Sequence, residues 1–125
     1  MDRFSVDVPW GLLRIESVGS SIGIPEKDPA GSPVDSHEEC VLVAVAQGGM
    51  EPVDVGVSLE EDGEDEGTCV FDGPLRILQD GFEVADMVGE EFRHHYPAPP
   101  GVARLRVWLD VPEEAQRVRI RLTAE

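Results

Sequence analysis

The chain has 125 residues, and its 26 Asp and Glu against 10 Lys and Arg give a formal net charge of −16 at pH 7. Residues 26–91 carry 19 carboxylates and two basic side chains, a net charge of −17, whereas residues 92–125 carry six Arg and four acids. A field of this sign repels nucleic acid and anionic membranes, so we expect neither as a partner, and it steers basic proteins toward the surface.

Hydrophobic side chains recur at every second position through much of the chain. This is the pattern of strands with one face on a core and the other in water. Residues 40–46 are apolar without alternation, which predicts a strand covered on both faces. In chain order, the predicted strands include residues 4–8, 40–46, 53–59, 74–78, 82–88, 105–111 and 118–122.

Turn signals separate these strands. Asp80-Gly81 predicts a hairpin between residues 74–78 and 82–88, because Gly accepts a positive φ. Pro99-Pro100-Gly101 ends one strand and begins the next. About eight to nine short strands joined by hairpins predict an all-β fold, an antiparallel β-sandwich with a barrel as the alternative.

Three segments depart from the alternating pattern. Residues 18–39 are predicted to form a long Gly/Ser/Pro loop, since Pro25, Pro29 and Pro33 each exclude a central strand. Residues 60–67 form an acidic loop whose like charges repel along the run. Residues 113–117 could form a helical turn.

The acidic loop, residues 60–67, has three open interpretations. It is a solvated connection, an anionic surface that meets a basic partner, or a calcium site, although the spacing of an EF-hand is missing. We carry the second interpretation forward, with residues 38 and 39 as a second patch. The candidate partner-binding residues are Glu60, Glu61, Asp62, Glu64, Asp65, Glu66, Glu38 and Glu39.

No motif predicts a metal site, a cofactor or catalysis. His94 and His95 are adjacent in a predicted strand, so their side chains point to opposite faces, one half-buried and one exposed. The chain lacks a Gly-x-Ser-x-Gly elbow, a phosphate-binding glycine loop and a His-Glu-x-x-His motif. We therefore expect a protein that is not an enzyme and that uses no metal and no cofactor.

The two cysteines, Cys40 and Cys69, bear on the compartment. The N-terminal residues lack the features of a signal peptide, and no stretch approaches the ~20 apolar residues of a membrane span. We expect a cytoplasmic protein, a single domain over residues 1–125, with both thiols reduced. A disulfide between the two cysteines and a catalytic thiol remain alternatives. A single Lys against nine Arg, with no Asn, indicates GC-rich bacterial coding.

A row of arginines lies near the C-terminus, on the two last predicted strands. If these strands pair, five guanidinium groups share one surface: Arg104, Arg106, Arg117, Arg119 and Arg121. Directly opposed like charges are destabilising, so this row needs carboxylates nearby. We expect an outer face with internal Arg–carboxylate pairs, and the alternative is a binding surface for an anionic partner.

The C-terminal half also carries a family resemblance. The hairpin built from Pro99-Pro100-Gly101, followed by residues 102–107 and 118–122, resembles that of small bacterial β-sandwich proteins of the competence protein J family. The segment of residues 70–73, Val-Phe-Asp-Gly, fits the same layout. The resemblance implies an all-β sandwich that inhibits a DNA-entry nuclease or, more broadly, an immunity partner of a toxin.

These observations together favour a non-enzymatic acidic binding module. The expected partner is a basic protein such as a nuclease or toxin, because nuclease sites are lined with basic side chains that hold phosphates. The alternatives are a structural or accessory β-sandwich domain, in which the acid confers only solubility, and a small calcium- or ligand-binding β domain.

Overall fold

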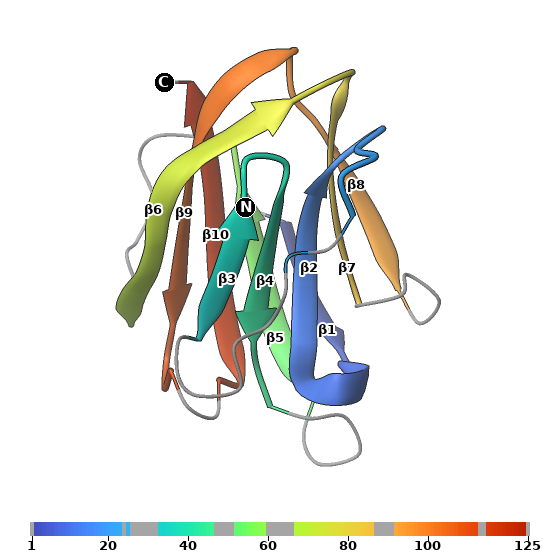
Figure 1. Ribbon diagram of the computed structural model, residues 1–125. Coiled ribbons are helices and arrows are strands. Elements are labelled where there is room, and N and C mark those ends of the chain that lie inside the picture. The colour runs from blue at the N-terminus through green and yellow to red at the C-terminus, as the bar shows by residue number, and fades with distance from the viewer. Residues whose placement is uncertain are drawn as a thin grey trace.

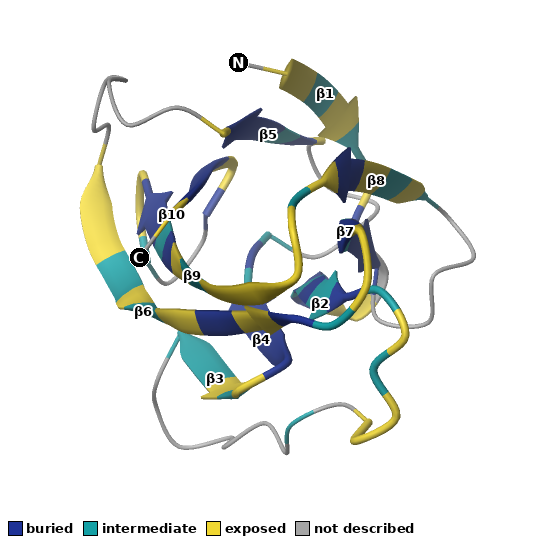
Figure 2. Ribbon diagram, turned by 90° about the horizontal axis from the view of Figure 1, so that it is seen from above, coloured by how far each residue is buried: buried dark blue, intermediate teal, exposed yellow. Residues whose placement is uncertain are grey.

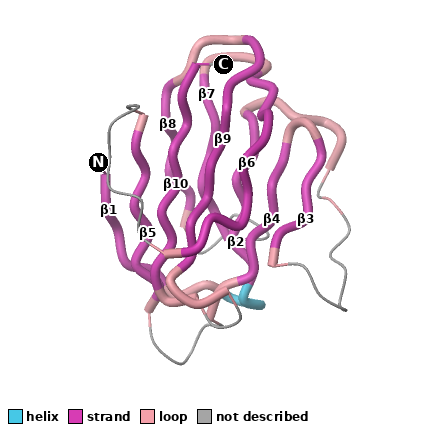
Figure 3. Tube along the Cα trace, turned by 90° about the vertical axis from the view of Figure 1, so that its left-hand side faces the viewer, coloured by secondary structure: helices cyan, strands magenta, loops and turns pink. Residues whose placement is uncertain are grey.

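The computed structural model describes residues 2–23, 25, 33–46, 52–59, 67–86, 92–112 and 115–124, which form a β-sandwich (Figures 1 and 3). Sheet A runs, from edge to edge, β1 (Asp2–Val6), β5 (Val53–Ser58), β10 (Arg117–Ala124), β9 (Gly101–Leu109) and β6 (Thr68–Ile77). Sheet B runs β3 (Val34–His37), β4 (Cys40–Ala44), β2 (Leu12–Ser17), β7 (Gly81–Asp86) and β8 (Arg93–Pro97). A short 3-10 turn, η1 (Pro9–Gly11), links β1 to β2. The predicted all-β sandwich is confirmed, but the hairpin predicted between residues 74–78 and 82–88 is wrong, because β6 lies in sheet A and β7 in sheet B and the two strands do not pair.

One neighbouring pair of strands in sheet A is parallel. β10 lies parallel to β5, with Val118 beside Val55, whereas the other described pairs are antiparallel. Parallel neighbours cannot be joined by a tight hairpin. Accordingly β5 is followed in the chain by β6, which lies at the opposite edge of the sheet, beyond β10 and β9 (Figure 1).

The long loop expected over residues 18–39 is wrong at its C-terminal end, where β3 lies. Pro33 directly precedes β3, and its carbonyl accepts a hydrogen bond from the Ala44 amide at 2.8 Å. A proline lacks only the amide donor, so it is compatible with the start of an edge strand such as β3. The helical turn considered for residues 113–117 is not found at Ala115 or Gln116, and β10 begins at Arg117; residues 113 and 114 lie outside the described part.

β2 is an additional strand, at the centre of sheet B between β4 and β7. Its residues alternate between buried and half-buried, and Leu13 and Ile15 lie in the core. β4 next to it is buried on both faces, as predicted from its continuous apolar run. Val41 and Val43 join the core, whereas Leu42 is fully buried on the other face.

β6 is longer than predicted, and it contains Pro74 in its interior. Proline is tolerated there because β6 is an edge strand, so no neighbour needs the missing amide. Two residues on, the Arg76 amide donates to the Glu38 carbonyl at 2.7 Å. This contact ties the edge of sheet A to the turn between β3 and β4 of sheet B.

The core lies between the sheets, and Figure 2 shows its buried strands at the centre and exposed residues along β6 and β1. At the edge where β1 meets β8, the Tyr96 hydroxyl donates to the Asp2 carboxylate at 2.6 Å. Phe4 stacks on His94, with ring centroids 3.9 Å apart. His94 is half-buried and His95 exposed, as predicted for neighbours on opposite faces.

Candidate functional site

Six of the eight predicted partner-binding residues lie outside the described residues: Glu60, Glu61, Asp62, Glu64, Asp65 and Glu66. The described residues on either side of them are Leu59, which is 42% exposed, and Gly67, whose φ is 91°. A Cβ at Gly67 would overlap the carbonyl oxygen of Leu109 at the end of β9. Glycine is therefore required where the acidic loop ends, both for its conformation and for its close approach to β9.

The other two predicted residues, Glu38 and Glu39, form the turn between β3 and β4. Glu38 is exposed. Glu39 is 6% exposed, and its carboxylate accepts a hydrogen bond from the Ser20 hydroxyl at 2.9 Å. Its backbone also donates to His37 Nδ1 and accepts from the Ser17 amide. Glu38 is thus available at the surface, whereas Glu39 links the turn between β3 and β4 to the end of β2 and the turn that follows it.

The five arginines of the C-terminal strands share the outer face of sheet A, as predicted. Arg121 pairs in register with Arg106, and Arg119 with Trp108. The Trp108 ring lies 4.9 Å from the Arg121 guanidinium carbon and 5.9 Å from that of Arg106. The aromatic face attracts both cations, which offsets part of the repulsion between them.

Carboxylates accompany this arginine row. Asp72 accepts two hydrogen bonds from Arg104, at 2.8 and 2.7 Å, and these bonds hold the pKa of Asp72 below its usual value. Asp54 pairs with Arg119 at 3.1 Å. Arg119 and Arg121 are each only 4% exposed and Arg106 is half-buried, whereas Arg104 and Arg117 are exposed. The pairs of Arg104 with Asp72 and of Arg119 with Asp54 fit the expected internal Arg–carboxylate pairing.

The thiols differ in their environment. Cys40 is buried, and its burial, followed by the nearby charge of Glu16, raises its pKa to about 12, so it stays protonated and is a poor nucleophile. Cys69 is exposed on β6, and the two cysteines do not form a disulfide with each other.

Among the residues that the structure describes, no group of three or more His, Cys, Asp or Glu side chains could hold a metal ion. Within those described residues, no helix is long and apolar enough to cross a membrane.

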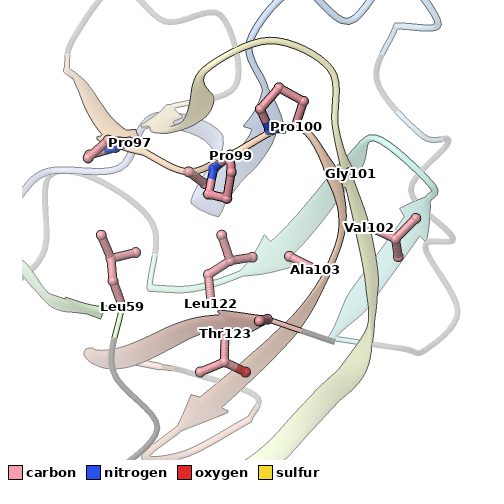
Figure 4. A pocket seen from close by; sticks show the side chains of 11 residues that line it. Leu59, Pro97, Pro99, Pro100, Gly101, Val102, Ala103, Leu122 and Thr123 are labelled. Atoms are coloured by element: carbon pink, nitrogen blue, oxygen red, sulfur yellow. The ribbon is translucent and has the colours of Figure 1, made fainter.

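An apolar pocket of about 290 Å³ lies at one end of the sandwich, and the strand analysis did not predict it (Figure 4). Its wall is formed by the turn between β8 and β9, the end of β10 and the residue after β5. The lining includes Leu59, Pro99, Val102, Ala103, Leu122 and Thr123. The sequence signal was the Pro99-Pro100-Gly101 turn, but the pocket exists only because three segments far apart in the chain meet there.

Comparison with known proteins identifies the fold. No protein-family model matches the chain, and no curated protein sequence does. Two solved structures are similar over nearly the whole chain. ComJ from Bacillus subtilis, an inhibitor of the DNA-degrading activity of NucA, has a TM-score of 0.76 at 8% identity, over 100% of this chain and 96% of ComJ. Crocagin biosynthetic gene J has a TM-score of 0.59 at 12% identity, over 99% of this chain and 95% of that one.

At these identities the likeness shows a shared fold and nothing further about activity. The fold expected from the resemblance of the C-terminal hairpin to competence protein J proteins is confirmed, and the structural similarity extends over the N-terminal half as well.

Proposed function

We propose that this protein is a non-enzymatic inhibitor that binds a basic protein, and that the partner is a nuclease. The observation that carries the proposal is the similarity of the whole fold to ComJ, which inhibits a nuclease. The charge supports it independently, since residues 26–91 carry a net charge of −17. A folded surface of carboxylates can occupy a site whose Lys and Arg side chains otherwise hold phosphates.

The acidic loop and Glu38 are the proposed contact residues. Glu38 is exposed in the turn between β3 and β4, and the loop has six carboxylates within seven positions of the chain. The sequence predicts that Glu39 binds the partner together with Glu38, but Glu39 is only 6% exposed and its carboxylate is hydrogen-bonded to Ser20. Little of this side chain can therefore contact a partner. We therefore assign Glu39 a role in the fold.

Electrostatic steering supplies the test. A variant in which the six carboxylates of residues 60–66 become Gln or Ser is compared with one in which six others are neutralised: Asp28, Glu51, Glu90, Glu91, Glu113 and Glu114. Both variants change the net charge equally, so only the position of the charge differs. A pull-down from the source lysate at low and then high salt identifies the partner, and surface plasmon resonance measures association and dissociation rates.

We expect the loop variant to lose at least tenfold in association rate at low salt, with a smaller change in dissociation rate, because charges at an interface rim act mainly on encounter. The control variant should lose much less. Stoichiometric wild-type protein should also block DNA degradation by the partner. Equal rates for the two variants would show that the loop is only a solvated connection, and undiminished DNA degradation would end the inhibitor proposal.

The second candidate is an accessory role in a biosynthetic pathway. It is supported by the similarity of the fold to crocagin biosynthetic gene J. One fold can serve different functions in different proteins, so a likeness to an inhibitor does not exclude this role. Under this alternative, the captured partner is a protein without nuclease activity, and binding survives high salt because it does not depend on steering.

A further inference from the structure

Trp10, in the short turn η1, is both exposed and conformationally strained. In the part of the chain that the structure describes, it is the most exposed of five large hydrophobic side chains, at 73%. Within the same ranges it is also the only residue other than Gly with a positive φ, at 65°. A left-handed backbone costs free energy in an L-residue, and strain of this kind clusters at functional sites. The turn therefore holds an indole in water at a position where Gly would be less strained.

The backbone that carries Trp10 is fixed on both sides. Pro9 at the start of η1 has a restricted φ, and the Gly11 amide donates to the Val8 carbonyl at 3.2 Å. The Gly11 carbonyl accepts from the Val45 amide at 2.9 Å, just beyond the end of β4, and Val8 is fully buried. An aromatic side chain on a backbone that is already ordered loses little conformational entropy on binding.

The other tryptophan shows which group an indole of this protein contacts. The ring of Trp108 is 4.9 Å from the guanidinium carbon of Arg121 and 5.9 Å from that of Arg106, and Trp108 is only 7% exposed. A guanidinium within about 6 Å of the centre of an indole ring is attracted by its face. Among the residues that the structure describes, no cation lies over the ring of Trp10. Its face is therefore open to a guanidinium from another molecule.

The charge of the molecule also favours a cation at Trp10. The formal net charge of the chain is −16, which repels the phosphates of nucleotides and of nucleic acid, the other common ligands of an exposed aromatic ring. Asp7, three positions before Trp10, is exposed. A guanidinium that stacks on the indole can also donate hydrogen bonds to a nearby carboxylate.

The described bases on the strands around η1 are held elsewhere or lie farther along the sheet. Arg14 pairs with Glu16 at 3.4 Å, and Arg119 pairs with Asp54 at 3.1 Å. Arg117 lies on β10, which is separated from β1 by β5. These charges therefore do not replace the cation that Trp10 lacks.

We infer that Trp10 is an interface anchor that stacks on an Arg guanidinium of the partner, with Asp7 as the accompanying carboxylate. The inference rests on the proposed function for the basic nature of the partner, and it adds a contact residue that the charge pattern did not predict. Trp and Arg are enriched among the few residues that dominate the affinity of interfaces. Loss of Trp10 should therefore act mainly on dissociation, whereas loss of surface charge acts mainly on association.

This anchor lies at the opposite end of the sandwich from Glu38. Leu12, directly after η1, pairs with Ala44 at the end of β4, whereas the turn that carries Glu38 lies at the Cys40 end of β4. Figure 3 shows η1 as the cyan segment at the lower end of the strands. The two surfaces can therefore be changed separately.

Synthetic peptides test Trp10 without the partner. The probes are acetyl-Gly-Arg-Gly-Arg-Gly-amide and the same peptide with Lys or with citrulline in place of each Arg. Lys keeps the charge without the planar group, and citrulline keeps the planar group without the charge. NMR follows the indole N–H of Trp10 and the amide of Gly11. We expect the Arg peptide to shift both signals saturably at millimolar concentration, the Lys peptide to bind at least threefold more weakly, and the citrulline peptide at least tenfold more weakly.

Three variants locate the binding, with the Gly11 amide as the reporter. Trp10→Asn removes the ring and keeps a residue that tolerates the left-handed conformation, so this variant should fold. We expect it to weaken the Arg peptide at least tenfold, and Asp7→Asn to weaken it at least twofold. Ile22→Ser removes another side chain that is more than half exposed, and it should change binding less than twofold. Urea unfolding checks that all three variants are folded.

The partner captured for the proposed function supplies a second measurement. Trp10→Asn should raise its dissociation rate at least tenfold, with a smaller change in association rate, whereas Ile22→Ser should change neither. Equal binding of the Arg and citrulline peptides, shifts of Gly11 that survive Trp10→Asn, or no shift at millimolar concentration would each overturn the inference.

These outcomes are distinct from a failure of the proposed function. Inhibition of a nuclease that is unaffected by Trp10→Asn leaves the function standing and removes this anchor. Binding of the Arg peptide at Trp10 without inhibition of any nuclease leaves the anchor and removes the nuclease.

Discussion

Two glycines with nearly the same φ angle should respond very differently to alanine. Gly67, between the acidic loop and β6, has a φ of 91°, and Gly23 has a φ of 92°. A Cβ at Gly67 would overlap the Leu109 carbonyl oxygen, whereas a Cβ at Gly23 has nothing within 4 Å. Gly23→Ala therefore measures the conformational cost alone, and Gly67→Ala adds the steric cost of displacing β9.

The magnitudes follow from these two costs. The left-handed conformation costs an L-residue about 1–2 kcal/mol. Alanine also lowers the conformational entropy of the unfolded chain, and this offsets about 0.4–1 kcal/mol of that cost. Gly23→Ala should therefore lower the free energy of unfolding by about 0.5–1 kcal/mol. At Gly67, displacing a paired backbone adds about 1–3 kcal/mol, as overpacking does in a core, for a total of about 2–4 kcal/mol.

Urea unfolding followed by far-UV circular dichroism measures both variants, and equal m-values are required for the comparison. Thermal unfolding should show the same order, with Gly67→Ala lowering Tm by roughly 10 °C and Gly23→Ala by a few degrees. If the two variants differ by less than about 0.5 kcal/mol, the close approach of Gly67 to β9 is refuted.

Three further predictions concern side chains. Burial, followed by the hydrogen bond to Asp2, raises the pKa of Tyr96, which is the single tyrosine. Protonated Tyr96 therefore stabilises the fold fully below the unfolded pKa of about 10, and this stabilisation is lost as the pH rises toward the pKa of the folded state. Tyrosinate absorbance should follow the titration, and Tyr96→Phe should abolish this loss of stability at high pH. Trp10 has a φ of 65° and is 73% exposed, so Trp10→Gly should stabilise the fold by about 0.5–1 kcal/mol in urea unfolding, and a loss of stability would show that its ring packs usefully. Ellman's reagent should label one thiol in the native protein, Cys69, and Cys40 only after denaturation; native labelling that persists in Cys69→Ser would contradict the burial of Cys40.

Local pattern was sufficient for most of the strands. The alternation at residues 118–122 and 105–111 correctly predicted that Arg119 and Arg106 leave the core on one face, because side chains of a strand alternate whatever its neighbours are. Asp80-Gly81 does mark a turn, but this turn passes from β6 in sheet A to β7 in sheet B and does not close the predicted hairpin. Alternation and turns depend on residues a few positions apart, whereas the partner of a strand depends on how the two sheets assemble.

Proline was a weaker guide. Pro33 and Pro74 both lie at or in edge strands, where a missing amide removes no hydrogen bond from a neighbour. Whether a strand is at an edge depends on the order of strands in the sheet. The sequence of a single strand carries no record of that order, which is why β3 was assigned to a loop.

The amino-acid sequence by itself determines the net charge and the segments of the chain that carry it, since each carboxylate is visible in the order of residues. What only the folded chain decided was which carboxylates are available. Glu38 and Glu39 are adjacent and chemically alike, yet one is exposed and the other is hydrogen-bonded to Ser20, 19 positions away. The same holds for the apolar pocket, whose walls come from Leu59, Pro99 and Leu122. Contacts between such distant residues arise from the packing of two sheets, and alternation within one strand contains no information about them.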